Sequence, residues 1–307
     1  SAASLTGKEI TRAASGPVRT AAVREYYPGD CRVQLTAFLS GYHPPEDLPR
    51  PLHGAALPHA GWMYSGQVAA RTLACFKNSP GPETVVIFGT PHYASGYGRM
   101  PLIDTVSHAL YHEGQWETPL GNLAVDSACG AAVLAAAGDL LRADPQAHQY
   151  EHSIEVLTPM VKYFFPESAI VPILVLPETT AVQLGEAAAQ AVNQLGRTTI
   201  FLASSDLTHY GPKFSQTTAG TGPEAKAWME KNDGLLIDAL CQGSGEEILN
   251  EARTNLNACG AGALAALKGA MSVLGAPQGR LIEYATSFDA EPEPVFRQAV
   301  GYAGVVF

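Results

Sequence analysis

The sequence lacks the features of nucleic-acid-binding and membrane-spanning proteins. Lysine and arginine total 19 against 29 aspartates and glutamates, and no basic cluster occurs that would neutralise a phosphate backbone. No run approaches the roughly 18 apolar residues that a membrane-spanning helix needs, and the first residues contain no apolar signal core. We therefore expect no nucleic-acid partner and no membrane association, and we predict a cytoplasmic protein.

The cysteines also exclude two classes of small scaffold. There are five, an odd number, and no two of them form a C-x-x-C pair. Neither a disulfide framework nor a zinc ribbon fits this spacing, so we expect reduced thiols.

What the chain does contain is a large apolar fraction, 46% of 307 residues, which is enough for a large core. Four apolar runs with strand character alternate with segments of helical spacing, and no linker or internal repeat interrupts them. This alternation predicts an α/β fold, a single domain with a mainly parallel central sheet flanked by helices. The strand runs are "HGAAL", "TVVIF", "AIVPILV" and "TTIFLA", and the helical segments are 65–77, 126–141, 152–165 and 181–195.

The last third changes character. Helical stretches at roughly 223–240, 245–253 and 259–273 precede "RLIEYATSF" and "AVGYAGVVF", which we predict to be two late strands. We assign residues 1–20 to a partly disordered N-terminal extension and residues 21–307 to the α/β domain.

Polar residues follow the apolar runs where loops should leave the sheet. His59 lies in "PHAG", His92 in "TPH", and Asp206 and His209 in "SSDLTHYG". In open α/β sheets, ligands bind just beyond the carboxyl ends of the strands. A single histidine at such a place is commonly a hydrogen-bonded structural residue, but several on convergent strand ends predict a binding or catalytic site.

Asp206 and His209 are three positions apart. If "DLTH" forms one helical turn they share a face, and the carboxylate can orient the imidazole as a general base. The alternative is that Asp206 caps a helix, which does not require His209.

Cys259 precedes a segment rich in small residues, "NACGAGALAAL". A helix N-terminus favours the thiolate, the form that binds metal or attacks carbon. A small buried residue, packed where Gly260 and Gly262 allow close approach, is an equal alternative.

The stretch "EHSIEVLTPMVKYFF" has mostly scaffold character, because its apolar residues recur at helical spacing. Within it, Glu151 or Glu155 is a candidate for a buried ion pair, and His152 is a candidate for lining the site.

Seven runs, taken together and in this order, resemble the Memo family, whose fold is similar to that of the class III extradiol dioxygenases. The resemblance extends from about residue 23 to the C-terminal "YAGVVF". The runs are "VREYYPGD", "LPHAGWMYSG", "FGTPHY", "WETPLGNLAVD", "EHSIEVLTP", "SSDLTHYG" and "NACGAG".

The resemblance implies a site for one metal ion formed by His59, His92 and Cys259, with Asp206 and His209 beside it as catalytic residues. We also expect Tyr64 and His152 to line this site. In the dioxygenases the comparable ligands to Fe(II) are two histidines and a carboxylate. Because a thiolate is softer, Cys259 accepts copper or zinc as readily as iron, and we favour iron or copper.

Three functions compete at this stage. The first is a metal-dependent oxidoreductase acting with oxygen on a small phenol-like substrate, with His209 as base. The second is a non-catalytic module with a vestigial dioxygenase-like cleft that binds a peptide or a protein. The third is a hydrolase with Cys259 as nucleophile, His209 as base and Asp206 orienting it, although the sequence contains no G-x-S-x-G turn.

Overall fold

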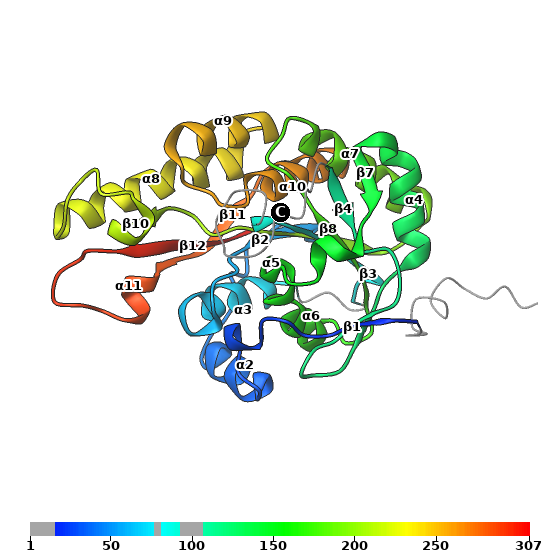
Figure 1. Cartoon of the computed structure of the whole chain (residues 1–307), viewed down its shortest axis with the longest axis horizontal. Helices are drawn as coiled ribbons and strands as arrows, with labels where there is room; N and C mark the ends of the chain where they lie inside the picture. The colour runs from blue at the N-terminus through cyan, green and yellow to red at the C-terminus, as the bar shows by residue number, and fades with distance from the viewer. Residues whose placement is uncertain (1–15, 77–80, 93–106) are drawn as a thin grey trace, which may run out of the picture.

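A nine-stranded mixed sheet forms the centre of the molecule (Figure 1). The computed structural model describes residues 16–76, 81–92 and 107–307. In the sheet the strands follow the order β10-β12-β2-β9-β3-β8-β4-β7, and β11 pairs with β12 outside this path. The bounds are β2 (Gly54–Leu57), β3 (Thr84–Gly89), β4 (His108–Leu110), β7 (Leu141–Ala143), β8 (Ala169–Leu174), β9 (Thr199–Ser204), β10 (His209–Tyr210), β11 (Arg280–Thr286) and β12 (Ala299–Val306).

The four predicted apolar runs are the four central strands, β2, β9, β3 and β8, and they pair in parallel. The two late strands are also confirmed as β11 and β12. The expectation of a mainly parallel sheet is correct for this centre and for the edge pair β4 and β7, but the sheet as a whole is mixed. Strand β12 runs antiparallel to β2, β10 and β11, and β4 runs antiparallel to β8. An antiparallel return between β11 and β12 needs no long crossover, and only the one-turn helix α11 (Ser287–Ala290) lies between them.

Helices cover both faces of the sheet, and the alternation of side chains along the strands separates two apolar cores (Figure 1). On β3, Val86 and Phe88 face the core formed with α4, α7, α8, α9 and α10, whereas Val85 and Ile87 face the core formed with α2, α3 and α6. The bounds are α2 (Cys31–Leu39), α3 (Gln67–Leu73), α4 (Ser127–Ala137), α5 (His152–Glu155), α6 (Thr158–Phe164), α7 (Thr180–Gln194), α8 (Pro223–Gln242), α9 (Gly245–Asn255) and α10 (Ala261–Val273).

Two of the predicted helices differ in detail. The segment 65–77 begins as the π-helical turn η2 (Trp62–Gly66) before α3, and the segment 152–165 divides into α5 and α6. Pro159 stands in the first turn of α6, where its missing N–H has no helical partner to lose. None of the helices in the described ranges is long and apolar enough to span a membrane.

The N-terminal segment packs on the domain from residue 18 onward. The strand β1 (Val18–Arg19) runs parallel to β5 (Gln115–Trp116), which pairs with β6 (Leu123–Ala124). The Arg19 guanidinium, which is buried, donates to the Glu155 carboxylate at 2.6 Å. Residues 1–15 of the expected extension lie outside the described residues.

Candidate metal centre

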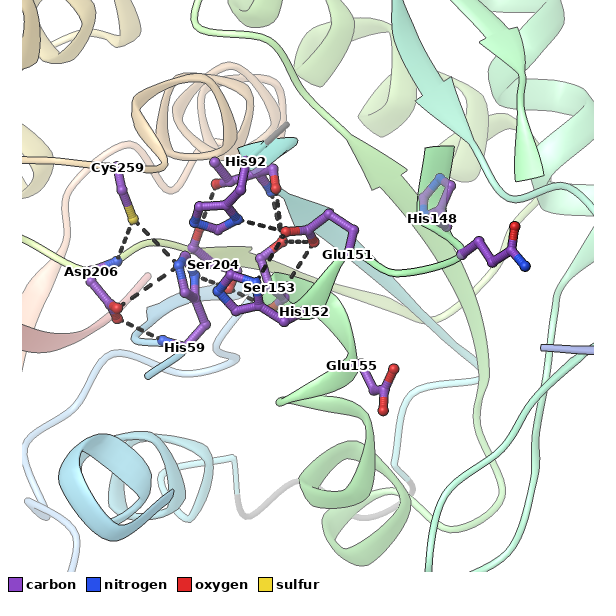
Figure 2. Close-up of polar contacts among 12 residues, drawn as sticks. His59, His92, His148, Glu151, His152, Ser153, Glu155, Ser204, Asp206 and Cys259 are labelled. Carbon is purple, nitrogen blue, oxygen red and sulfur yellow. Dashed lines mark hydrogen bonds and ion pairs between the residues drawn. The ribbon is translucent and has the colours of Figure 1, made fainter. Parts of the chain in front are cut away.

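Five of the predicted site residues meet at the carboxyl ends of the parallel strands (Figure 2). His59 follows β2, His92 follows β3 and Asp206 follows β9, while His152 begins α5 and Cys259 precedes α10. Their ligand atoms form two groups of three, each within 4.8 Å and both containing His59. The groups are His59, His92 and His152, and His59, Asp206 and Cys259.

The imidazole of His59 is held in one tautomer by a relay of hydrogen bonds. Its Nδ1 lies 2.7 Å from Ser204 Oγ, and that hydroxyl donates its proton to the Ser153 carbonyl at 2.7 Å. Ser204 Oγ therefore accepts from His59 Nδ1–H, and Nε2 is the ring nitrogen that faces the cluster. This Nε2 lies 3.3 Å from Cys259 Sγ, in a ring that is only 1% exposed.

A buried carboxylate orients His92 in the same way. His92 Nδ1 is 2.6 Å from Glu151 Oε1, and the other carboxylate oxygen accepts the Ser153 backbone N–H at 2.8 Å. His92 also forms a hydrogen bond with Cys259. Carboxylate–histidine pairs of this kind orient metal-binding imidazoles and raise their basicity.

Glu151 and His92 each stabilise the charged form of the other. Burial alone would raise the pKa of Glu151, but the hydrogen bond and positive charge of His92 lower it to about 2. Burial alone would lower the pKa of His92, but hydrogen bonds to Cys259 and Glu151 raise it well above its ordinary value. The carboxylate therefore stays ionised beside the imidazole.

Cys259 lies at the N-terminal end of α10, as predicted. Its thiol accepts the Asp206 backbone N–H at 3.3 Å. Burial would raise the pKa of the Cys259 thiol, but the charge and hydrogen bond of His59 and the hydrogen bond of His92 lower it to about 6. The expected close approach at Gly260 is confirmed, because a Cβ there would lie 2.4 Å from the Ser204 carbonyl oxygen, whereas Cys259 itself is only partly buried.

His152 lies against the same cluster, as expected for a residue lining the site. Its ring stacks on His92 with centroids 4.2 Å apart and on Tyr26 with centroids 4.8 Å apart. Burial, followed by the nearby charges of His92 and His59, lowers the pKa of His152 to about 3 against the opposing charge of Glu151. The neutral imidazole offers a lone pair at the cluster.

Tyr64 stands on the turn after His59, but its hydroxyl donates to Glu291 Oε2 at 3.1 Å. No hydrogen bond or ring contact connects it to the described histidines or to Cys259. Its place as a lining residue stays a prediction.

Asp206 belongs to the cluster, whereas His209 stands apart from it. One carboxylate oxygen of Asp206 accepts the His59 backbone N–H at 2.8 Å, and the other lies 3.8 Å from His59 Nε2. Residues 205–208 form no helix and His209 begins β10, so the expected helical turn and the alternative helix cap are both wrong. Neither a hydrogen bond nor an ion pair joins these two described side chains; His209 Nδ1–H instead donates to the Leu207 carbonyl at 2.9 Å.

The environment of Asp206 is nevertheless sensitive to His209. Burial raises the pKa of Asp206, and the positive charge of His209 opposes that rise. The two groups therefore interact through space rather than through a shared hydrogen bond.

Sequence patterns did not indicate most of the residues that orient the clustered histidines. Ser153 and Ser204 were not singled out, although Ser204 stands at the end of an apolar run followed by candidate site residues. Glu151 was considered only as a member of an ion pair, and it does pair with His92. Glu155, the other candidate, forms its ion pair with Arg19, away from the histidines.

Imidazole nitrogen and thiolate sulfur are the donor atoms that zinc, copper and iron accept, and here two imidazoles and a low-pKa thiol lie together. The cluster therefore has the donor atoms and the supporting hydrogen bonds of a metal centre.

Comparison with known proteins agrees with the sequence motifs. The family described as "Memo-like protein" matches residues 25–306. A MEMO1 family protein of Methanococcoides burtonii is 34% identical over 286 residues, covering 92% of this chain and 96% of the relative. Similar proteins of Methanopyrus kandleri (36% identical, 85% of each chain) and Pyrococcus horikoshii (32% identical, 92% of this chain and 96% of the relative) bear the same family name.

Proposed function

This chain belongs to the Memo family, and on that premise we propose that it binds one metal ion through His59, His92 and Cys259 and uses it as an oxidoreductase. The observation that carries the proposal is the orientation of the two histidines. The Nδ1 atoms of His59 and His92 are engaged by Ser204 Oγ at 2.7 Å and by Glu151 at 2.6 Å. Their opposite edges are thereby available to an ion beside the Cys259 thiol.

The donor set favours iron or copper, with zinc as the third candidate. Imidazole suits all three metals, and thiolate favours copper and zinc as well as iron. A bound iron or copper ion would supply oxygen and one-electron chemistry to a small phenol-like substrate. A fold like that of the class III extradiol dioxygenases is part of this proposal.

Within this scheme the protein's own residues bind, orient and move protons. Asp206 holds the His59 backbone through its 2.8 Å hydrogen bond and places its other carboxylate oxygen 3.8 Å from His59 Nε2. His209, outside the ligand cluster, is assigned the role of proton acceptor for substrate.

The hydrolase alternative has less support from the contacts. The histidines beside the Cys259 thiol are His59, at 3.3 Å, and His92, whereas the alternative requires His209. No contact among the described residues favours a peptide- or protein-binding module.

Metal analysis of anaerobically purified protein tests the proposal. We expect about one iron or copper ion per chain, and loss of most of it in His59→Ala and Cys259→Ala. Cys129→Ala is the matched control, because Cys129 is a buried cysteine on α4 that belongs to neither group of clustered ligand atoms. Metal-free wild-type protein after reloading with Fe(II) and Cu(I), or equal loss in the Cys129 variant, would refute metal binding.

Oxygen uptake with catechol as probe tests the second half of the proposal separately. Loaded protein that retains its ion but consumes no oxygen with catechol or other simple phenols would refute the assigned reaction and leave the metal site standing.

A further inference from the structure

Two consecutive polar residues lie buried on α8, behind the candidate metal centre. Asn232 is 6% exposed and Asp233 is 0% exposed. Buried amide and carboxylate groups cost free energy unless they are hydrogen-bonded, so their partners show what they hold in place. Most of those partners belong to two chain segments that carry site residues.

The first segment is the stretch after β9. Asp233 Oδ1 accepts the backbone N–H of Thr208 at 2.8 Å, and Asn232 Nδ2 donates to Thr208 Oγ1 at 3.0 Å. Thr208 is fully buried between Asp206 and His209. Both side chains of the α8 pair therefore hold the peptide that places Asp206.

The second segment leads from α9 into α10. Asn232 Nδ2 also donates to the Asn255 carbonyl at 3.1 Å, and Asn257 Nδ2 donates to the Asn232 backbone carbonyl at 2.8 Å. Asn257 is fully buried and stands two residues before Cys259. The same position on α8 thus anchors the segment that places the thiol.

The two segments meet at the site itself. Cys259 N–H donates to the Asp206 carbonyl at 3.2 Å, and Asp206 N–H donates to Cys259 Sγ at 3.3 Å. The α8 pair is held firmly in turn, because Tyr284 OH donates to Asp233 Oδ2 at 2.6 Å and Gly301 packs against that carboxylate. A Cβ at position 301 would lie 2.0 Å from Asp233 Oδ2, so the backbone of Gly301 leaves the carboxylate no room to move in that direction.

We infer that Asn232 and Asp233 are positioning residues of the metal centre: by bonding Thr208 on one side and Asn255 and Asn257 on the other, they set the distance between Cys259 and His59. Neither side chain touches the donor atoms. They act through the two backbone segments, which are far apart in sequence and bond to each other beside the donor atoms. The inference concerns the site of the proposed function, although the geometry itself does not depend on which metal binds.

The test compares Asn232→Leu, which keeps the side-chain size and removes both donated hydrogen bonds, with Asp233→Asn as a milder variant. Thr84→Val is the matched control, because Thr84 is also fully buried and donates to Asp126 at 2.6 Å, at the opposite end of the parallel strands. All chains are first freed of metal by a chelator, and their unfolding free energies are measured in urea.

Two measurements then report on Cys259. The first is the alkylation rate of the Cys259 thiol by iodoacetamide at neutral pH in metal-free protein, followed on the Cys259 peptide. The second is the affinity for Co²⁺ and the intensity of the thiolate-to-cobalt charge-transfer band per bound ion.

We expect Asn232→Leu to change the alkylation rate about tenfold, since the thiol leaves its place beside His59 and its exposure to the reagent changes. Co²⁺ affinity should fall about 10- to 100-fold, as for other residues that support metal ligands, and the charge-transfer band should weaken. Asp233→Asn should shift these quantities in the same direction by less, and Thr84→Val should leave them unchanged at a similar loss of stability.

An unchanged alkylation rate in folded Asn232→Leu and Asp233→Asn, or an equal change in Thr84→Val, overturns the inference. If wild-type protein binds no Co²⁺, the proposed metal function fails while the alkylation measurement still decides the positioning role. If Asn232→Leu does not fold, Asp233→Asn provides the same two readouts.

Discussion

Replacing Glu151 with glutamine should weaken metal binding more than it weakens the fold. Glu151 accepts His92 Nδ1–H at 2.6 Å and the Ser153 N–H at 2.8 Å, using different carboxylate oxygens. A glutamine has one acceptor oxygen, so one of these two donors must face an N–H group. His92 also loses the negative charge that raises its basicity.

The structure sets the scale of the effect. The pKa of Glu151 falls from 4.5 to about 2, because His92 and Ser153 outweigh burial. At 1.36 kcal/mol per pKa unit this corresponds to about 3 kcal/mol in favour of the ionised carboxylate. Loss of such a partner typically costs 10- to 100-fold in metal affinity, about 1.4–2.8 kcal/mol.

Glu155→Gln is the matched control, since Glu155 is the next glutamate of the same helical segment and is fully buried. Its partners are Arg19 at 2.6 Å and Tyr27 OH at 2.7 Å, and it contacts none of the clustered histidines. Removing one member of a buried ion pair costs about 3–5 kcal/mol. Glu155→Gln should therefore lose the greater stability and keep wild-type metal affinity.

The assay is a competition titration of Fe(II) or Zn²⁺ against a chelator, with urea unfolding of the metal-free chains in parallel. We expect Glu151→Gln to lose 10- to 100-fold in affinity and Glu155→Gln to stay within about twofold. Equal affinities for Glu151→Gln and wild type would show that His92 needs no carboxylate. In that case either His92 is not a ligand of the metal, or Glu151 does not support it as a ligand.

Three further outcomes are expected. His209→Ala should keep nearly all bound metal, unlike His59→Ala. Its oxygen uptake should fall about 10²–10⁴-fold, because the proton acceptor for the substrate is lost. Equal metal loss in the two variants would show that His209 is a metal ligand instead. Burial lowers the pKa of His148 to about 4, so its neutral form contributes stability that is complete above about pH 6.5 and is lost as the pH falls toward 4. His148→Gln should flatten urea stability across that range by up to about 3 kcal/mol, and an unchanged slope would contradict the assignment. Gly185→Ala should lower the free energy of unfolding in urea by ~3 kcal/mol and leave metal affinity unchanged. The added Cβ would lie 1.8 Å from the Ala266 carbonyl oxygen and push α7 away from α10. A variant as stable as wild type would show that the two helices can move apart without cost.

Much of the site was accessible from the sequence because parallel strands end at a common edge. The apolar runs before His59, His92 and Asp206 are β2, β3 and β9, and their carboxyl ends bring these residues together. Cys259 was recognisable from the small residues after it, which let α10 pack closely. Chain order and burial patterns were sufficient for these residues.

The hydrogen-bond partners of side chains far apart in the sequence could not be predicted from local patterns. Glu151 meets His92 across 59 residues, and Arg19 meets Glu155 across 136 residues. Such partners depend on strand register and on how α5 sits over β3, neither of which appears in a local pattern. Glu151 and Glu155 are equivalent candidates in sequence, yet one orients a histidine of the cluster and the other anchors the N-terminal segment.

The sequence by itself determined the four central strands, the α/β class and the residues that end at the sheet edge, because a buried parallel strand needs a continuous apolar run. Only the tertiary structure decided the antiparallel strands beside that centre, since the apolar pattern of a strand specifies its burial and not its direction. It also separated His209 from Asp206, because residues 205–208 follow the hydrogen bonds that Asp233 and β12 offer rather than forming a local helical turn. Short-range spacing therefore identified which groups are present, and long-range packing decided which of them touch.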